Sequence, residues 1–261
     1  MKFLKKSLGQ NFLIDQNIIR KIINLVDVKN RHIVEIGPGD GALTKEILNK
    51  KPKSLILIEK DSDLVSKLKF KFLNERIEII NDDILKFDLE RKIKKKSIVF
   101  GNLPYNMSSQ ILVKLLKFKI WPPNFTDLVL MFQKELSDKI TGKYLSAHHG
   151  RLYILSNYRM KIIKKFLVSK NCFFPKPKIT SQVIHFSPKS FEKFSIKNLN
   201  NLEKVTNILF SNKRKMINKN IKKILNEKEI NSIIDLKLDL RPENIKPEVY
   251  YKIAKLYERK S

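Results

Sequence analysis

Cysteine and histidine are scarce in this chain of 261 residues, and no long apolar run occurs. The single cysteine, Cys172, excludes an intramolecular disulfide and a metal site built from several thiolates. The four histidines form no His-x-x-x-His pair, so we predict that the functional site holds no metal. The strongly apolar runs, such as Leu55–Ile58, are far shorter than the ~20 residues that cross a bilayer. Because polar Gly9–Asn11 follow the basic start, where a signal peptide has its apolar core, we expect a cytoplasmic protein with no membrane partner.

Acidic residues are also few relative to basic ones. The chain has 54 Lys and Arg against 26 Asp and Glu, which gives a formal net charge of +28. A polyanion releases the counterions condensed on its phosphates when it is bound, so this excess of positive charge favours a nucleic-acid partner. A basic protein without such a partner is the alternative, because composition alone does not distinguish the two.

Strand-like and helix-like segments alternate along the first part of the chain. The predicted strands are His32–Ile36, Ser54–Glu59, Ile77–Ile80, Ser97–Gly101, Asp127–Phe132, Ile162–Val168 and Gln182–Phe186. The predicted helices are residues 15–26, with Asp15 as the N-cap, and Leu43–Asn49, Asp61–Leu73 and Ser108–Phe118. This alternation predicts an α/β fold with a mostly parallel, Rossmann-like sheet of seven strands covered on both faces. The last two strands have no helix between them, so we expect an antiparallel hairpin at one sheet edge.

The pattern changes after Pro188, where no further strand is predicted. Helical segments follow at Leu199–Phe210, Lys213–Leu225, Lys228–Ile233 and Pro247–Glu258. We therefore place a domain boundary between residues 189 and 190, with an α/β domain at 1–189 and a small all-helical domain at 190–261.

Three glycines at alternate positions follow the first predicted strand, in the run Gly37–Gly41, here called the glycine loop. Glycine lets the backbone pass close to a ligand and turn sharply into the next helix, and we expect this approach at Gly37 and Gly39. The G-x-G-x-G spacing differs from the G-x-G-x-x-G of dinucleotide enzymes. A tight turn without a ligand is the alternative interpretation.

Acidic residues lie at the ends of the next two strands. Glu59 ends the second strand, 22 residues after Gly37, where its carboxylate can accept both hydroxyls of a ribose. Asp83 follows the third strand and can accept from an adenine amino group, with Asp82 as a rival for that contact. Parallel strands end at one edge of a sheet, so the glycine loop and these acids favour an adenosyl ligand there. Together with the motif that follows, they predict S-adenosylmethionine as the cofactor.

The fourth strand runs into the tetrapeptide Asn102-Leu103-Pro104-Tyr105 at the same edge. This motif suits an exocyclic aromatic amine, which is barely nucleophilic because its lone pair is spread into the ring. The Asn102 amide oxygen and the Leu103 carbonyl can hold the N–H groups and favour a tetrahedral nitrogen, while Pro104 shapes the turn. Tyr105 can stack on the base and fix it for in-line attack on a methyl group. An ordinary Asn-Pro turn after a strand is the alternative.

A second aromatic motif lies in the predicted hairpin loop, at Phe173–Lys178, where prolines stiffen the chain. We predict that Phe173 covers the other face of a flipped base, opposite Tyr105. For Phe174 we favour a place in the core.

Together these residues resemble the ribosomal RNA adenine dimethyltransferase family, and most closely its bacterial small-subunit (KsgA-type) branch. The resemblance covers nearly the whole chain. The segments that carry it are Leu8–Leu13, Glu35–Thr44, Glu59, Asp83, Asn102–Tyr105, Phe173–Pro177, Phe210–Asn218 and Arg241–Ile245.

The resemblance implies the class I S-adenosylmethionine-dependent methyltransferase fold. It implies that residues 1–30 form an N-terminal segment and helix over the cofactor, with Asn11 and Leu13 in contact with it. It further implies that Gly37 approaches the methionine part and Glu59 the ribose. Asp83 would contact the adenine, and Asn102 would lie near the transferring methyl.

The implied reaction is the formation of N6,N6-dimethyladenosine, by four methyl transfers, at two adjacent adenosines near the 3′ end of 16S rRNA. The implied substrate is the small (30S) ribosomal subunit or its late precursor, which gives the protein a role in ribosome biogenesis. Residues 1–189 would then be catalytic and residues 190–261 would bind RNA or the ribosome. A monomer is the default expectation.

Two other functions are considered. The first is a large-subunit rRNA adenine methylase of the macrolide-resistance type, which the Leu8–Leu13 segment and the helical domain disfavour. The second is a non-catalytic RNA-binding assembly factor, which would be expected to lack cofactor or catalytic residues that this chain retains.

Overall fold

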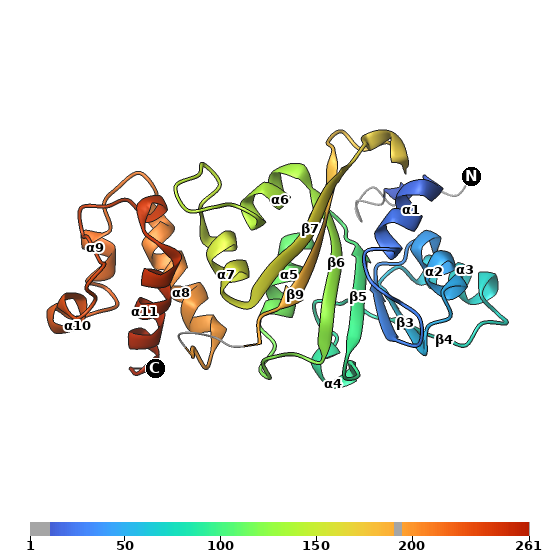
Figure 1. Ribbon diagram of the computed structural model, residues 1–261, viewed down its shortest axis with the longest axis horizontal. Coiled ribbons are helices and arrows are strands. Elements are labelled where there is room, and N and C mark those ends of the chain that lie inside the picture. The colour runs from blue at the N-terminus through green and yellow to red at the C-terminus, as the bar shows by residue number, and fades with distance from the viewer. Residues whose placement is uncertain (1–10, 191–194, 261) are drawn as a thin grey trace. The chain divides into compact units, whose positions relative to one another are not determined.

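The largest sheet has seven strands in the order β4-β3-β2-β5-β6-β9-β7 (Figure 1). Their bounds are β2 His32–Ile36, β3 Ser54–Glu59, β4 Ile77–Asn81, β5 Ser97–Asn102, β6 Phe125–Gln133, β7 Met160–Val168 and β9 Ser181–Pro188. Neighbouring strands from β4 to β6 are parallel, and β9 is antiparallel to β6. The prediction of a mostly parallel seven-stranded sheet that ends in an antiparallel hairpin is confirmed.

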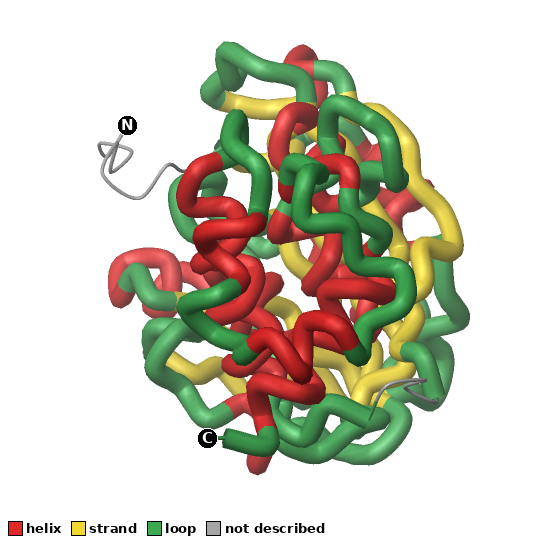
Figure 2. Tube along the Cα trace, turned by 90° about the vertical axis from the view of Figure 1, so that its left-hand side faces the viewer, coloured by secondary structure: helices red, strands yellow, loops and turns green. Residues whose placement is uncertain are grey.

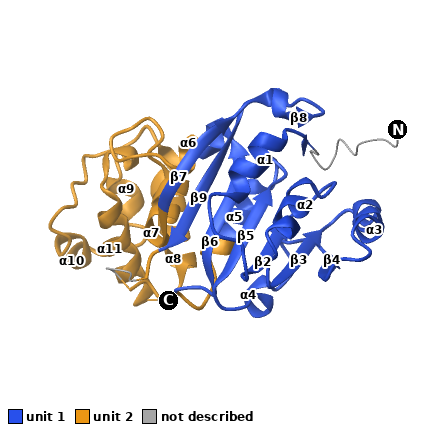
Figure 3. Ribbon diagram, turned by 45° about the vertical axis from the view of Figure 1, so that its right-hand side comes forward, with its two compact units in different colours: residues 1–114, 122–137, 162–188 blue, residues 115–121, 138–161, 189–261 orange. Residues whose placement is uncertain are grey.

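The structure is a computed structural model that describes residues 11–190 and 195–260. Figure 2 shows their helices, strands and loops in different colours. Two units are distinguished by their internal contacts (Figure 3). Unit 1 comprises Met1–Lys114, Pro122–Ser137 and Ile162–Pro188, and unit 2 comprises Leu115–Trp121, Asp138–Lys161 and Lys189–Ser261. Unit 2 thus includes the predicted helical domain together with two segments that occur earlier in the chain.

Helices cover the central strands of unit 1, β2, β3 and β5, because nearly all residues of these strands are buried. The helices that begin in this unit are α1 Gln16–Ile23, α2 Ala42–Asn49, α3 Ser62–Lys71, α4 Leu89–Lys92, α5 Ser108–Leu116 and α6 Lys134–Ile140. Ile33 of β2 shares a buried cluster with Ile19 of α1 and Ile47 of α2. The next strand residue, Val34, points to the opposite face and is also buried, so both faces of the sheet are covered at β2.

The first helix of unit 1 begins where its sequence predicts. The Asp15 carboxylate accepts hydrogen bonds from the Asn17 and Ile18 amides at 2.9 and 3.1 Å, which satisfies two of the donors left open at a helix start. The helix ends at Ile23, three residues before the predicted end at 26.

Unit 2 contains α7 Arg151–Arg159, α8 Leu199–Leu209, α9 Asn218–Ile221, α10 Glu227–Asn231 and α11 Pro247–Glu258. Its core includes the fully buried Tyr250, whose ring stacks on Phe210 at 5.6 Å and whose hydroxyl donates to the Pro242 carbonyl at 2.7 Å. The prediction of a helix at Lys213–Leu225 is wrong for most of that range, where the structure has only the short helix α9. The Ile217 amide donates instead to the Leu240 carbonyl of a distant segment, at 3.0 Å.

None of the helices in residues 11–190 and 195–260 is long and apolar enough to span a membrane.

We predict that Gly41→Ala lowers the free energy of unfolding by about 2–4 kcal/mol. Gly41 precedes α2 with φ +80°, in the left-handed region, and an added Cβ would lie 2.7 Å from the Phe72 ring. Urea denaturation measures the loss. Gly150→Ala is the matched control, because Gly150 is extended and its added Cβ meets nothing nearer than 4.0 Å. Equal losses in the two variants would contradict this account of Gly41.

Candidate active site

A hollow of about 770 Å³, partly open to solvent, lies in unit 1 where β2, β3 and β5 end. The predicted residues that line it are Asn11, Leu13, Gly37, Gly39, Glu59, Asn102, Leu103, Pro104 and Tyr105. Asp83 and Phe173 are not among its lining residues. The structure therefore brings most of the predicted site together around one cavity.

The glycine loop and the Asn102–Tyr105 turn lie next to each other and both line this hollow. The strands that carry them, β2 and β5, are adjacent and parallel, with Ile36 opposite Gly101. Gly37 has φ +64°, and a Cβ added to it would lie 3.8 Å from both the Asn102 carbonyl oxygen and the Pro104 ring. Two motifs that are far apart in the sequence thus lie so close together that one methyl group on Gly37 would bring them into van der Waals contact.

The described end of the N-terminal segment lies over the glycine loop. A Cβ added to Gly39, which has φ +60°, would lie 3.0 Å from the Phe12 ring. Phe12 belongs to β1 Phe12–Leu13, which pairs antiparallel with β8 Phe173–Phe174. Of the predicted Leu8–Leu13 motif, Leu8–Gln10 lie outside the described residues.

Glu59 presents a nearly buried carboxylate to the hollow. Its Oε1 accepts from the Asp61 amide at 2.9 Å and its Oε2 accepts from the Gly39 amide at 3.2 Å. Burial is the main cause that raises the pKa of Glu59 above its ordinary value. A carboxylate has about four lone-pair positions, so it can also accept from two hydroxyls of a ligand.

The Asn102 side chain is oriented by the N-terminal segment. Its Nδ2 donates to the Asn11 carbonyl at 3.1 Å. A carbonyl only accepts, so the amide nitrogen must face Asn11, and Oδ1 is left as an acceptor on the other side. The nearby Tyr105 hydroxyl hydrogen-bonds Ser181 Oγ at 2.7 Å, and burial raises the pKa of Tyr105. Both side chains of the turn therefore have a defined orientation.

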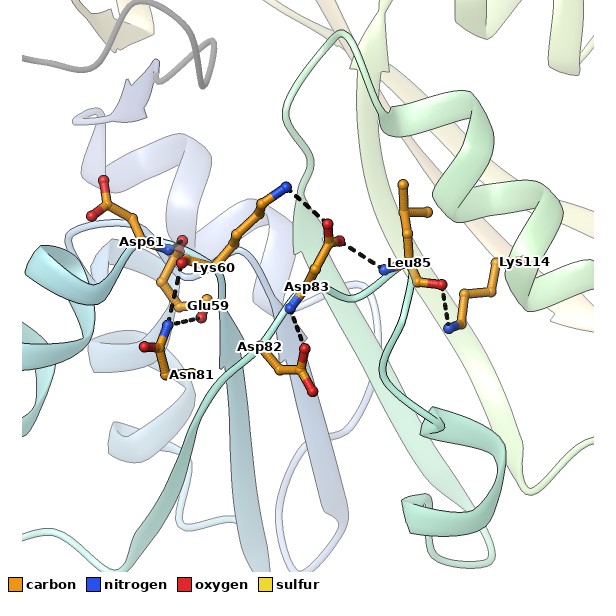
Figure 4. A network of polar contacts seen from close by, with 8 residues as sticks. All are labelled: Glu59, Lys60, Asp61, Asn81, Asp82, Asp83, Leu85 and Lys114. Atoms are coloured by element: carbon orange, nitrogen blue, oxygen red, sulfur yellow. Dashed lines mark hydrogen bonds and ion pairs between the residues drawn. The ribbon is translucent and has the colours of Figure 1, made fainter.

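Asp83 lies in a network beside the hollow (Figure 4). Its Oδ2 pairs with Lys60 Nζ at 2.8 Å and its Oδ1 accepts from the Leu85 amide at 2.9 Å. The hydrogen bond from Lys60 is the main cause that lowers the pKa of Asp83. Asp82 accepts from the Asp83 amide at 2.6 Å. Lys60, which was not predicted, is the member of this pair that lines the hollow, and the adenine contact of Asp83 or Asp82 stays a prediction.

The two phenylalanines of β8 lie on opposite sides of that strand. Phe173 is 3% exposed and belongs to the buried cluster of unit 1, whereas Phe174 is 55% exposed. The prediction that Phe174 is a core residue is therefore wrong. Successive strand residues point to opposite faces, and Phe173 occupies the inner one. The role of Phe173 as a cover for a base stays a prediction.

Glu35 lines the hollow and was not predicted as a site residue. It lies in the middle of β2, is 1% exposed, and accepts a hydrogen bond from the Thr44 hydroxyl at 2.7 Å. Burial raises the pKa of Glu35 to about 8. A glutamate within the apolar strand His32–Ile36 is the signal that sequence reasoning could have used.

Among residues 11–190 and 195–260, no group of three or more His, Cys, Asp and Glu side chains is arranged to hold a metal ion.

Comparison with known proteins decides the family. The model of the family described as "Ribosomal RNA adenine dimethylase" matches residues 1–259. The chain belongs to this family. The predicted resemblance to rRNA adenine dimethyltransferases is thereby confirmed.

Two similar proteins align with this chain over almost its whole length. It is 46% identical to "Ribosomal RNA small subunit methyltransferase A" of Pelagibacter ubique (strain HTCC1062) over 258 residues, 97% of each protein. It is 40% identical to the protein with the same description from Malacoplasma penetrans (strain HF-2) over 257 residues, 97% of this chain and 91% of that protein.

Two solved structures show the fold of this dimethylase. A dimethyladenosine transferase from Plasmodium falciparum has a TM-score of 0.76 at 24% identity, and the 23S rRNA methyltransferase ErmE has 0.70 at 21%. In each case the match covers 95% of this chain and 98% of the other. The predicted methyltransferase fold is confirmed.

We predict that Glu35→Gln flattens the pH dependence of stability. Glu35 holds its proton in the folded chain up to about pH 8, whereas its ordinary pKa is 4.5. The wild type therefore loses stability as pH rises through this interval, by up to about 1.4 kcal/mol per unit. Glutamine mimics the protonated acid, so the variant should gain on the wild type between pH 5 and pH 8. Urea denaturation at both pH values measures this gain, with the exposed Glu75→Gln as control. If Glu35→Gln and the wild type lost the same free energy of unfolding between pH 5 and pH 8, Glu35 would not be protonated in the folded chain.

Proposed function

We propose that this chain uses S-adenosylmethionine to dimethylate N6 of two adjacent adenosines near the 3′ end of 16S rRNA. The substrate is the small (30S) ribosomal subunit or its late precursor, and the protein acts as a monomer in the cytoplasm during ribosome biogenesis. The observation that carries this proposal is that Gly37 lies beside Asn102 and Pro104 and that all three line one hollow. The 46% identity to a protein described as a small-subunit methyltransferase supports the choice of particle.

The residues around the hollow fit S-adenosylmethionine. Gly37 and Gly39 line the hollow, and because they carry no side chains their backbone would lie close to the methionine part. Glu59 would accept from the ribose hydroxyls, and Asn11 and Leu13 would cover the ligand from the N-terminal segment. Asp83 or Asp82 would contact the adenine from the network beside the hollow. When bound, S-adenosylmethionine supplies an electrophilic methyl group.

The turn at the end of β5 would hold and orient the target amine. Asn102 Oδ1, on the side away from Asn11, would accept one N–H of the adenine N6. The Leu103 carbonyl would accept the other, so that the nitrogen lone pair points at the methyl group. Tyr105, fixed through its hydroxyl to Ser181, would stack on one face of the flipped base. Phe173 would reach the other face after a local movement, since it is buried here.

The charge of the chain supports an RNA partner. The formal net charge of +28 exceeds what solubility requires and favours binding to phosphates. We assign RNA or ribosome binding to residues 190–261 and catalysis to residues 1–189, as the sequence predicts.

A methyl-transfer assay with labelled S-adenosylmethionine tests the proposed function. Its substrates are undermethylated small subunits, large subunits and free rRNA, followed by mass spectrometry of the nucleosides. Dimethyladenosine that arises only in small subunits is the expected result. Label in the large subunit would indicate a resistance-type methylase, and cofactor binding without any transfer would indicate an assembly factor.

We predict that Asn102→Ala lowers the transfer rate on the order of 100-fold, because an acceptor positioned for the reacting amine is lost. Its affinity for the small subunit should stay within about twofold of the wild type, because the amine contact is a small part of a phosphate-dominated interface. Filter binding measures the affinity, and the exposed Asn49→Ala serves as control. Equal loss of binding and transfer would mean that Asn102 acts through the structure instead.

A further inference from the structure

The segment Phe174–Ser181, here called the proline loop, is attached at both ends to residues that line the hollow. At one end Phe174 pairs with Phe12, and at the other Ser181 hydrogen-bonds the Tyr105 hydroxyl at 2.7 Å. Phe12 and Tyr105 both line the hollow. Both ends of the proline loop therefore lie beside the site.

Phe174 is on the side of β8 that faces away from the core. Residues directly opposite in a ladder point to the same face, so Phe174 shares a face with Phe12. The other pair of this ladder, Leu13 and Phe173, is buried in the core. An aromatic ring that is 55% exposed thus stands beside a residue of the site.

The rest of the proline loop adds positive charge to this ring. Lys176 and Lys178 are both exposed, while Pro177 between them is buried and holds that part of the loop against unit 1. An exposed ring next to lysines on a stiff loop is the arrangement that binds single-stranded nucleic acid, because bases stack on the ring and phosphates meet the charges.

We propose that Phe174 is a stacking platform for an rRNA base next to the target adenosine, with Lys176 and Lys178 on the adjoining phosphates. This inference rests on the proposed function, since it names how the same site holds its RNA. It assigns the outer phenylalanine of the motif a contact with a neighbouring nucleotide, which is distinct from the contact predicted between Phe173 and the target base.

Phe174→Ala tests the proposal. Loss of one base–aromatic stack should lower kcat/KM for small subunits, and RNA affinity, about fivefold to 100-fold. The affinity for S-adenosylmethionine, measured by calorimetry, should stay unchanged. Phe174→Trp should keep the wild-type values because the ring is retained, whereas Phe174→Leu should lose as much as Phe174→Ala. Phe70→Ala, which removes a ring that is 85% exposed on α3, is the matched control and should leave both quantities unchanged.

Several results would overturn the proposal. One is a Phe174→Ala variant whose kcat/KM and RNA affinity equal those of the wild type. Another is a Phe174→Leu variant that keeps the wild-type values. A third is a Phe174→Ala variant that loses as much affinity for S-adenosylmethionine as for RNA. Failure of the proposed function is recognised separately, because the wild type would then transfer no methyl group to any particle. In that event the RNA affinities alone decide, and equal values for wild type and Phe174→Ala would overturn the role of Phe174.

Discussion

The close approach of the glycine loop to the Asn102–Tyr105 turn is the constraint on which the site depends. It follows from the parallel pairing of β2 and β5, which places Ile36 opposite Gly101. Gly101 allows this pairing, because an added Cβ would lie 2.6 Å from the Leu103 side chain and 3.3 Å from the Ile36 carbonyl oxygen. Gly37 after β2 and Gly101 within β5 thus let two backbone turns share one cavity.

Two buried acidic side chains line this cavity. Glu35 and Glu59 lie on neighbouring strands and both line the hollow, and burial raises the pKa of each. A buried carboxylate is tolerated when it is protonated or fully hydrogen-bonded. Glu35 has the Thr44 hydroxyl and Glu59 has two backbone amides. Glu59, held by two backbone amides, is therefore the charged acceptor that this cavity offers, while Glu35 is a neutral acid near pH 7.

The sequence predicted the sheet well because its strands are short apolar runs separated by helical patterns. It also predicted most of the lining of the hollow, since glycines and polar residues at strand ends meet at one edge. The sides of β8 could not be predicted, because a strand of two residues has no period. The buried Arg159 of α7 gave no signal either, because its acceptors, the carbonyls of Leu116 and Phe118, are far away in the sequence. The helix expected at Lys213–Leu225 failed because its pattern does not reveal the hydrogen bond from Ile217 to Leu240.

A crystal structure with S-adenosylhomocysteine tests most directly whether the two turns serve one ligand. The account predicts that the ligand occupies the hollow of unit 1, with its ribose hydroxyls on Glu59, its amino-acid part beside Gly37 and its sulfur facing Asn102. A ligand bound elsewhere, or bound in the hollow with its sulfur turned away from Asn102, would contradict the account.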